Sequence, residues 1–203
     1  MMLGDFQWQS DLIALCKYVR GKIWFNYSSG APHGVVDIVN KYRDYGKYSN
    51  FKKRCIIKEI IKSVCEYLKL NYNYINLKLK QYTARFNECL GTFRANSEVG
   101  ADILITYSSQ FSIYRQTAII VHELTHYFAY VNDINFEIEE EICTDILSIF
   151  LGFYSIMHQG CAVETYVGDE MFGEKREMAA GYLCGLELEY CKMMISAMQY
   201  VKM

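Results

Sequence analysis

The sequence predicts an α+β fold from three successive patterns: a lysine-rich amphipathic segment, a stretch of alternating polar and apolar residues, and a long half with helical periodicity. Helical and strand-like segments that occupy separate parts of a chain are typical of this fold class. The 203 residues suffice for one domain with a substantial core. We find no interdomain linker and predict a single domain over 1–203, with a helical portion over 1–70, a sheet over 71–110 and a helical half over 111–203.

The segment 51–70 carries the first pattern. Its apolar residues recur at helical spacing with lysines between them, at Ile57, Ile61, Val64 and Leu68. This pattern predicts an amphipathic helix that packs one face against the core.

Strand-like composition follows this helix. Alternating residues rich in β-branched and aromatic types predict three strands, over 74–82, 84–95 and 101–108, and the last two are expected to form a hairpin. Beyond residue 110 the pattern becomes helical, in blocks near 114–131, 136–157 and 174–200. These elements predict a small sheet of about three or more strands packed against helices.

The charge balance argues against nucleic-acid and membrane partners. The formal net charge of −2 comes from 21 basic and 23 acidic residues spread along the chain, which gives no strong attraction to polyanions. The amino terminus has no basic segment ahead of its short apolar run, so neither a secretory signal nor a membrane span is predicted. A cytoplasmic location is therefore expected.

The eight cysteines are predicted to be reduced. None falls in a C-x-x-C pair, and most lie in apolar or helix-like surroundings. Since disulfides are rare in the cytosol, buried thiols are the expected state.

The stretch 121–126, VHELTH, holds two of the four histidines of the chain. Residues four apart lie on the same face of a helix, so His122 and His126 can present two imidazoles to one ion while Glu123 projects beside them. Zinc favours nitrogen ligands in a tetrahedral site, and a catalytic site keeps one position for water. The motif therefore predicts two zinc ligands and a general base within two helical turns.

A buried helix could carry the same letters by chance. A random shuffle of this composition yields H-E-x-x-H in roughly 0.6% of sequences, and the apolar flanks predict a buried helix. Two histidines and a glutamate buried without partners would each cost about 1–3 kcal/mol. A bound metal removes this cost, which favours the metal site.

Zinc hydrolases commonly add a histidine or a glutamate as a third ligand. We expect the helix that carries the motif to end near Tyr130 and the next helix to begin near Phe136 and to return antiparallel to it. His126 would then lie about 6 Å before the turn and Glu141 about 7.5 Å after it. Because the two are level, Glu141 is the predicted third ligand.

The neighbouring acids are expected to play other parts. Glu137 would not lie level with His126, and Glu140 would point roughly 100° away around the helix axis. Glu137 and Glu139 are instead expected to complement the helix dipole. Asp145 lies one turn deeper in the second helix, level with His122. A metal-bound histidine usually donates its other N–H to a carboxylate or carbonyl, so Asp145 is expected to orient His122.

The sequence HELTH followed by EEICTD resembles the gluzincin metallopeptidases, which complete H-E-x-x-H with E-x-x-x-D on a glutamate helix. The short separation is most similar to the minigluzincin type, and the resemblance covers residues 84–153. It implies a zincin-like fold and one Zn²⁺ per chain, held by His122, His126 and Glu141. It also implies that Glu123 is the general base and that Asp145 orients one of the zinc ligands.

The resemblance further implies hydrolysis of a peptide or protein substrate. Zinc lowers the pKa of its bound water and polarises the scissile carbonyl, while Glu123 takes the proton and passes it to the leaving amine. The strand ADILITY is expected at the sheet edge above the cleft, where an extended peptide binds by strand addition. The alternative is a catalytically silent or autoinhibited zinc-binding interaction domain on the same scaffold.

Gluzincin-like sites usually add a Tyr, His or Arg that stabilises the oxyanion of the tetrahedral intermediate. The candidates are Tyr166, Tyr182, His158 and Arg176, of which we favour Tyr182. The segment 161–177 breaks the helical pattern and is predicted to be a loop, either a mobile one at the cleft or a plain connection.

Overall fold

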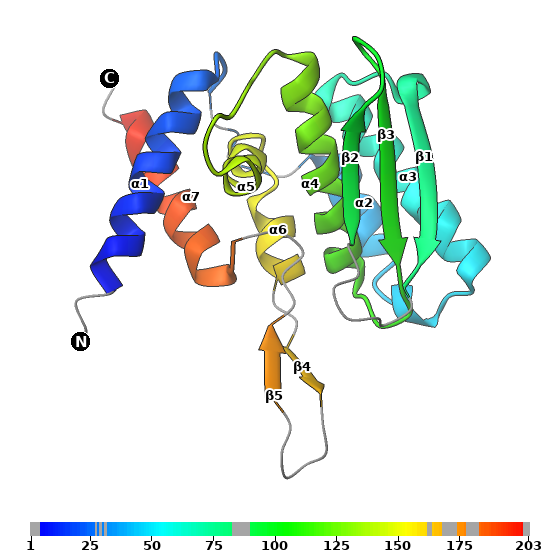
Figure 1. The fold of residues 1–203 in the computed structure, drawn as a ribbon. Helices are drawn as coiled ribbons and strands as arrows, with labels where there is room; N and C mark the ends of the chain where they lie inside the picture. Colours follow the sequence, from blue (N-terminus) through cyan, green and yellow to red (C-terminus); the bar gives the residue numbers. More distant parts are fainter. Residues whose placement is uncertain are drawn as a thin grey trace.

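The computed structural model describes residues 5–26, 28, 30, 32–82, 90–161, 164–167, 174–177 and 183–200. Figure 1 shows a three-stranded mixed sheet at one side of this part of the chain, with helices behind it and beside it. The predicted α+β class with a small mixed sheet is therefore confirmed.

The main sheet has the order β1-β3-β2 and contains β1 (Ile75–Gln81), β2 (Gly91–Ala95) and β3 (Ala101–Tyr107). β1 and β3 are parallel, whereas β2 and β3 are antiparallel and form the predicted hairpin. Leu77 and Phe93 are both register partners of Ile103, so the three side chains share one face. The first part of the predicted strand 84–95, residues 84–89, lies outside the described residues.

The prediction that ADILITY forms the sheet edge is wrong, because β3 is the central strand. Its residues Ala101, Ile103, Ile105 and Tyr107 are all buried. A central strand is paired on both sides, and these alternate residues pack against the helices that cover one face of the sheet. The edge strands of this sheet are β1 and β2, and β2 is the one that packs closely on the helix with the VHELTH stretch.

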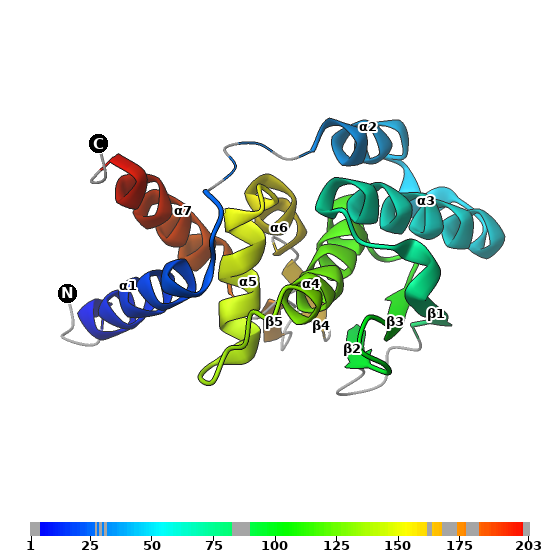
Figure 2. The same ribbon diagram turned by 90° about the horizontal axis from the view of Figure 1, so that it is seen from above.

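Two helices lie side by side on the same side of the sheet, α3 (Asn50–Leu68) and α4 (Ile113–Val131) (Figure 2). Both agree closely with the predicted helices 51–70 and 114–131. Apolar residues of α3 such as Ile57, Ile61 and Val64 are buried, as its amphipathic pattern predicted. This packing makes α4, with its histidines, the centre of the molecule.

α4 is buried over nearly its whole length, and its threonine hydroxyls are satisfied within the helix. The Ser112 hydroxyl caps the helix by accepting a hydrogen bond from the Arg115 N–H at 3.0 Å. Thr117 and Thr125 each donate to the carbonyl oxygen four residues earlier, at 2.8 Å. Such internal bonds let these hydroxyls be buried without a partner from another element.

The predicted helix over 136–157 is two helices, α5 (Glu140–Phe150) and α6 (Tyr154–Cys161). The chain turns between them at Gly152, whose φ of +92° is readily accessible to glycine. Across this turn the Phe153 N–H donates to the Ser148 carbonyl oxygen, an arrangement found at many helix C-termini. The break is hidden in the sequence because apolar residues continue on both sides of it.

The carboxy-terminal helix is also shorter than predicted. α7 spans Gly185–Tyr200, while part of the predicted helix is the strand β5 (Glu174–Glu177), which pairs antiparallel with β4 (Glu164–Val167). The segment 161–177, predicted as a loop, therefore contains both strands of this antiparallel pair. Strands of four residues with mixed composition resemble loops or helices in sequence, which explains the error.

The amino-terminal portion is helical as predicted, with α1 (Asp5–Lys22), α2 (His33–Lys41) and the short 3-10 helix η1 (Tyr45–Lys47) before α3, and a further 3-10 helix, η2 (Tyr72–Tyr74), after it. α1 packs on α5 and α7 (Figure 1). The Tyr18 hydroxyl accepts a hydrogen bond from the Glu137 N–H at 3.0 Å, and the Tyr18 ring contacts Phe136. α1 therefore braces the connection between α4 and α5.

No helix among the described residues is both long and apolar enough to cross a membrane. The seven described cysteines are all free thiols, and five of them are buried.

We predict that Gly152→Ala destabilises the protein by about 1–3 kcal/mol, because alanine strains a positive φ. A Cβ there would also lie 2.5 Å from the Gly30 carbonyl oxygen. Urea unfolding measures the loss. Gly21→Ala is the control, since a Cβ at Gly21 meets nothing within 4 Å; equal stability of the two variants would contradict the role of Gly152.

Candidate metal centre

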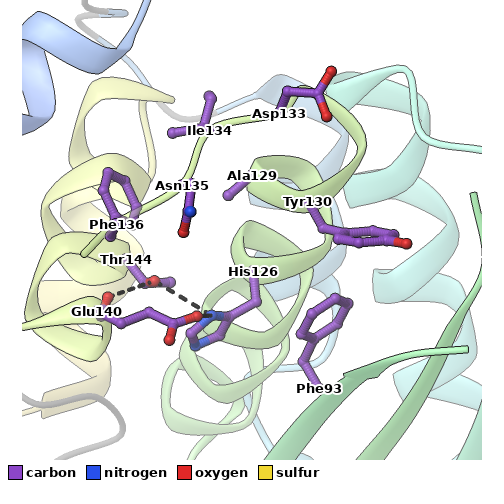
Figure 3. Close-up of a pocket in the computed structure, with 10 residues that line it drawn as sticks. All are labelled: Phe93, His126, Ala129, Tyr130, Asp133, Ile134, Asn135, Phe136, Glu140 and Thr144. Carbon is purple, nitrogen blue, oxygen red and sulfur yellow. Dashed lines mark hydrogen bonds and ion pairs between the residues drawn. The ribbon is translucent and has the colours of Figure 1, made fainter. Parts of the chain in front are cut away.

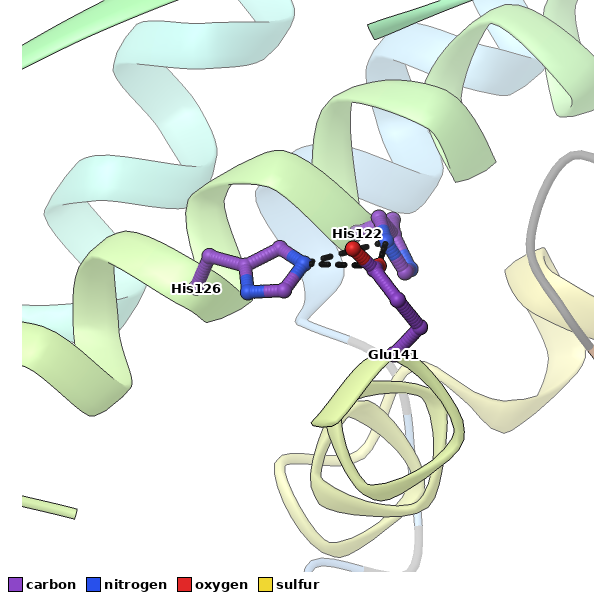
Figure 4. A group of neighbouring side chains, drawn as sticks. All are labelled: His122, His126 and Glu141. Carbon is purple, nitrogen blue, oxygen red and sulfur yellow. Dashed lines mark hydrogen bonds and ion pairs between the residues drawn. The ribbon is translucent and has the colours of Figure 1, made fainter. Parts of the chain in front are cut away.

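Three predicted ligands converge on one point between α4 and α5 (Figure 4). The Nε2 atoms of His122 and His126 are 3.2 Å apart. A carboxylate oxygen of Glu141, Oε2, lies 2.9 Å from the first and 3.1 Å from the second. Among the described residues, these three are the one group of His, Cys, Asp or Glu side chains that could hold a metal ion.

The three donor atoms fit a tetrahedral zinc site. Zinc bonds of about 2.0–2.1 Å to nitrogen and oxygen place two ligands of a tetrahedron roughly 3.3 Å apart. The observed separations of 2.9, 3.1 and 3.2 Å are close to this value. Two imidazole nitrogens and one carboxylate are also the donor types that zinc accepts.

Asp145 holds His122 in the orientation that this site needs. The Nδ1 atom of His122 lies 2.8 Å from Asp145 Oδ1, and a carboxylate at this distance accepts the Nδ1 proton, so that Nε2 faces Glu141. The other oxygen, Oδ2, accepts a hydrogen bond from the Leu183 N–H at 2.9 Å. The predicted position of Asp145 beside His122 agrees with this geometry, whereas its contact with Leu183 was not predicted.

His126 has corresponding neighbours that the sequence interpretation missed. Its Nδ1 atom lies 3.4 Å from the Thr144 hydroxyl and 3.7 Å from a carboxylate oxygen of Glu140. Glu140 was expected to point away from the site. The spacing of Glu140 and Thr144, four residues apart on one face of α5, is the signal that could have identified the pair.

The ring of His126 is also held by the sheet. Phe93 of β2 stacks on it with an interplanar angle of 5° and a centroid distance of 5.9 Å. This parallel, offset arrangement restricts rotation of the imidazole. β2 and α5 therefore position the same ligand from opposite sides.

The proton affinities of the cluster reflect its buried carboxylates. Burial disfavours the charged form of His122, but hydrogen bonds with Asp145 and Glu141 outweigh it and raise the pKa to about 10. The hydrogen bond from His122 lowers the pKa of Glu141 to about 2 against the effect of its partial burial. Burial, followed by the charge on His122, lowers the pKa of His126. His122 thus carries a positive charge next to Glu141, and a metal cation bound at this point would take the place of its proton.

Glu123 lies beside the cluster on the face of α4 that meets β2. It is 6% exposed, and burial raises its pKa to about 7. Its carboxylate occupies the space above Gly91, where a Cβ would lie 2.7 Å from both Glu123 Cδ and Cγ. The glycine in β2 therefore makes room for the predicted general base.

Glu141 reaches the histidines by a different route from the predicted one. α5 begins at Glu140 and not near Phe136, and the connection from α4 runs over residues 132–139. Figure 4 shows α5 end-on while α4 runs across the view, so the expected antiparallel arrangement is wrong. Ile134 and Phe136 are buried in the connection, and Asp133 and Glu139 adopt positive φ. These anchors and turns direct the first turn of α5 towards α4.

The described residues do not identify the oxyanion-stabilising residue. Tyr182 and its side chain lie outside them, although the next residue, Leu183, is bonded to Asp145. Tyr166 and Arg176 belong to β4 and β5, of which the structure describes the backbone. His158 lies on α6, where its ring contacts Tyr154.

No protein-family model, curated protein or solved structure matches this chain. The geometry of the site and the chemistry of its residues are therefore the features that indicate a function.

We predict that the protein binds one zinc ion per chain and that Asp145→Asn weakens binding about 10–100-fold, because His122 loses its carboxylate partner. Glu141→Ala should weaken binding further, since it removes a ligand. Competition with a chromogenic chelator measures both affinities. Glu137→Ala is the control, because the Glu137 side chain is 74% exposed and pairs with Lys22. Wild-type affinity in Glu141→Ala would contradict the assigned ligand set.

Proposed function

We propose that this chain is a zinc-dependent metallopeptidase, in which His122, His126 and Glu141 hold the metal. The observation that carries the proposal is the buried carboxylate of Glu123 beside three side chains whose donor atoms fit a zinc ion. Three protein ligands leave one position of a tetrahedral ion open, as in catalytic sites, whereas structural zinc sites have four protein ligands. The motifs H-E-x-x-H and E-x-x-x-D, which resemble those of the gluzincins and their minigluzincin type, support the same function and a zincin-like fold.

Glu123 is the proposed general base. A zinc ion bound at this site would supply a water activated at neutral pH and would polarise the scissile carbonyl. The Glu123 carboxylate accepts the proton of the attacking water and returns it to the nitrogen of the leaving amine. Burial raises the pKa of Glu123 to about 7, and a nearby dication would favour its charged form, which is the form that accepts a proton.

The substrate is proposed to be an extended peptide that lies along β2. β2 is an edge strand of the sheet, and its residues Gly91 and Phe93 face Glu123 and His126. An added strand would hydrogen-bond to the β2 backbone and bring a peptide carbonyl next to the metal ligands. Tyr182 remains the favoured candidate for stabilising the resulting oxyanion.

The burial of the site favours a second candidate function, a catalytically silent or autoinhibited zinc-binding interaction domain. His122, Glu123 and His126 are each less than 9% exposed. Glu141, with a side chain 43% exposed, is the ligand that faces solvent. A peptidase needs a path for substrate to this point, whereas a silent domain does not.

We predict that Glu123→Gln lowers kcat/KM by about 10²–10⁴-fold on a cleaved peptide, because the amide cannot accept the proton. Zinc content should stay unchanged, since Glu123 is not a ligand. Cleavage is followed by mass spectrometry with a peptide library. Glu98→Gln, an exposed glutamate in the turn between β2 and β3, is the control.

Persistence of wild-type cleavage in Glu123→Gln would exclude the proposed mechanism. A zinc-loaded wild-type protein that cleaves no library peptide would support the silent or autoinhibited domain.

We predict that Gly91→Ala lowers kcat by about 10²-fold, because the new methyl group displaces the Glu123 carboxylate by roughly an ångström. KM and zinc content should change much less. Steady-state kinetics separates the two constants. Thr92→Ala is the matched control, since Thr92 is exposed and points to the opposite face of β2. Similar kinetics of the two variants would show that Gly91 has no part in positioning the base.

A further inference from the structure

A cavity of about 270 Å³ opens directly beside the candidate metal centre (Figure 3). It is bounded by β2, by the carboxy-terminal part of α4, by the connection 133–136 and by the first turns of α5. His126 forms part of its lining and also belongs to the metal triad. A substrate group in this cavity would therefore lie next to the proposed site of cleavage.

The size and walls of the cavity suit one amino-acid side chain. Its volume is below the range of roughly 300–1,000 Å³ that is typical of pockets for drug-sized ligands. Phe136 and Phe93 lie on opposite sides of it (Figure 3), and Ala129 and Ile134 add apolar surface. An aliphatic chain can pack between such walls and lose contact with water.

The charged groups of the cavity are both acidic. Asp133 and Glu140 line it, and no lysine or arginine does so among the described residues. Both carboxylates are exposed, and Figure 3 shows the Glu140 carboxylate turned towards His126 while Asp133 lies on the opposite side of the lining residues. A carboxylate has acceptor sites for several donors, so the contact of Glu140 with His126 leaves room for a further one.

We propose that this cavity selects a substrate residue with a basic side chain, lysine or arginine, beside the scissile bond. The aliphatic stem packs between the aromatic walls, and the cationic head pairs with one of the two carboxylates, Glu140 or Asp133. The faces of Phe93 and Phe136 add a cation–π attraction. The inference rests on the proposed peptidase function and names the class of its substrate.

The test uses hexapeptide sub-libraries that carry lysine, arginine, citrulline, norleucine or glutamate at each position in turn. Zinc-loaded wild-type protein is assayed for cleavage, and zinc-loaded Glu123→Gln protein is assayed for binding by equilibrium dialysis. At one position, peptides with lysine or arginine should be cleaved and bound about tenfold better than peptides with citrulline or norleucine. The difference comes from one exposed ion pair and a cation–π contact.

The charge preference should disappear in the double variant Asp133→Asn, Glu140→Gln and persist in Glu137→Gln, whose side chain does not line the cavity. Because the readout is a ratio between two peptides within one variant, a general loss of activity does not change it. The stability of each variant is checked by thermal unfolding.

The outcomes distinguish a failure of the proposed basic-residue preference from a failure of the proposed peptidase function. Cleavage without a basic preference, or a preference that survives in the double variant, overturns the inference and leaves the peptidase function standing. Charge-dependent binding without any cleavage overturns the peptidase function and retains the cavity as a site for basic side chains. Equal binding of lysine and citrulline sub-libraries overturns the inference whether or not the wild-type protein cleaves them.

Discussion

The buried hydrogen bond between His122 and Asp145 connects α4 to α5, and the other groups of the candidate site depend on the position that it sets. Both side chains are at most 6% exposed, and they meet at 2.8 Å. Asp145 also accepts from the Leu183 N–H, so the segment that leads into α7 is attached at the same point. Removal of one partner would leave a buried polar group without this bond, at a cost of about 1–3 kcal/mol.

The sheet forms the other wall of the site. Alternate residues of β2 face α4, and Gly91 and Phe93 lie against Glu123 and His126 respectively. A shift of one residue in the pairing of β2 with β3 would turn both of them to the opposite face. The register of a short edge hairpin therefore controls the space available to the proposed base and the orientation of one proposed ligand.

Some of the site follows from spacing within one helix, and that part was predicted well. His122, Glu123 and His126 are placed by the helical repeat alone, because an α-helix has the same geometry wherever it lies. The selection of Glu141 agrees with the structure although the helix start and the antiparallel arrangement behind it were wrong. The first turn of α5 faces α4 in both arrangements, so the same residue reaches the histidines.

The sequence by itself determined the α+β class, the helix with the H-E-x-x-H motif and the choice of Glu141 and Asp145 as acids that meet it, because local periodicity and side-chain chemistry decide these features. Only the tertiary structure decided which strand lies at the sheet edge, why Gly91 is a glycine, and that Glu140 and Asp133 border a cavity beside His126. These features depend on contacts between residues far apart in the chain, which leave no periodic trace in a single sequence. Packing between elements, and not local propensity, therefore shaped the surroundings of the proposed zinc site.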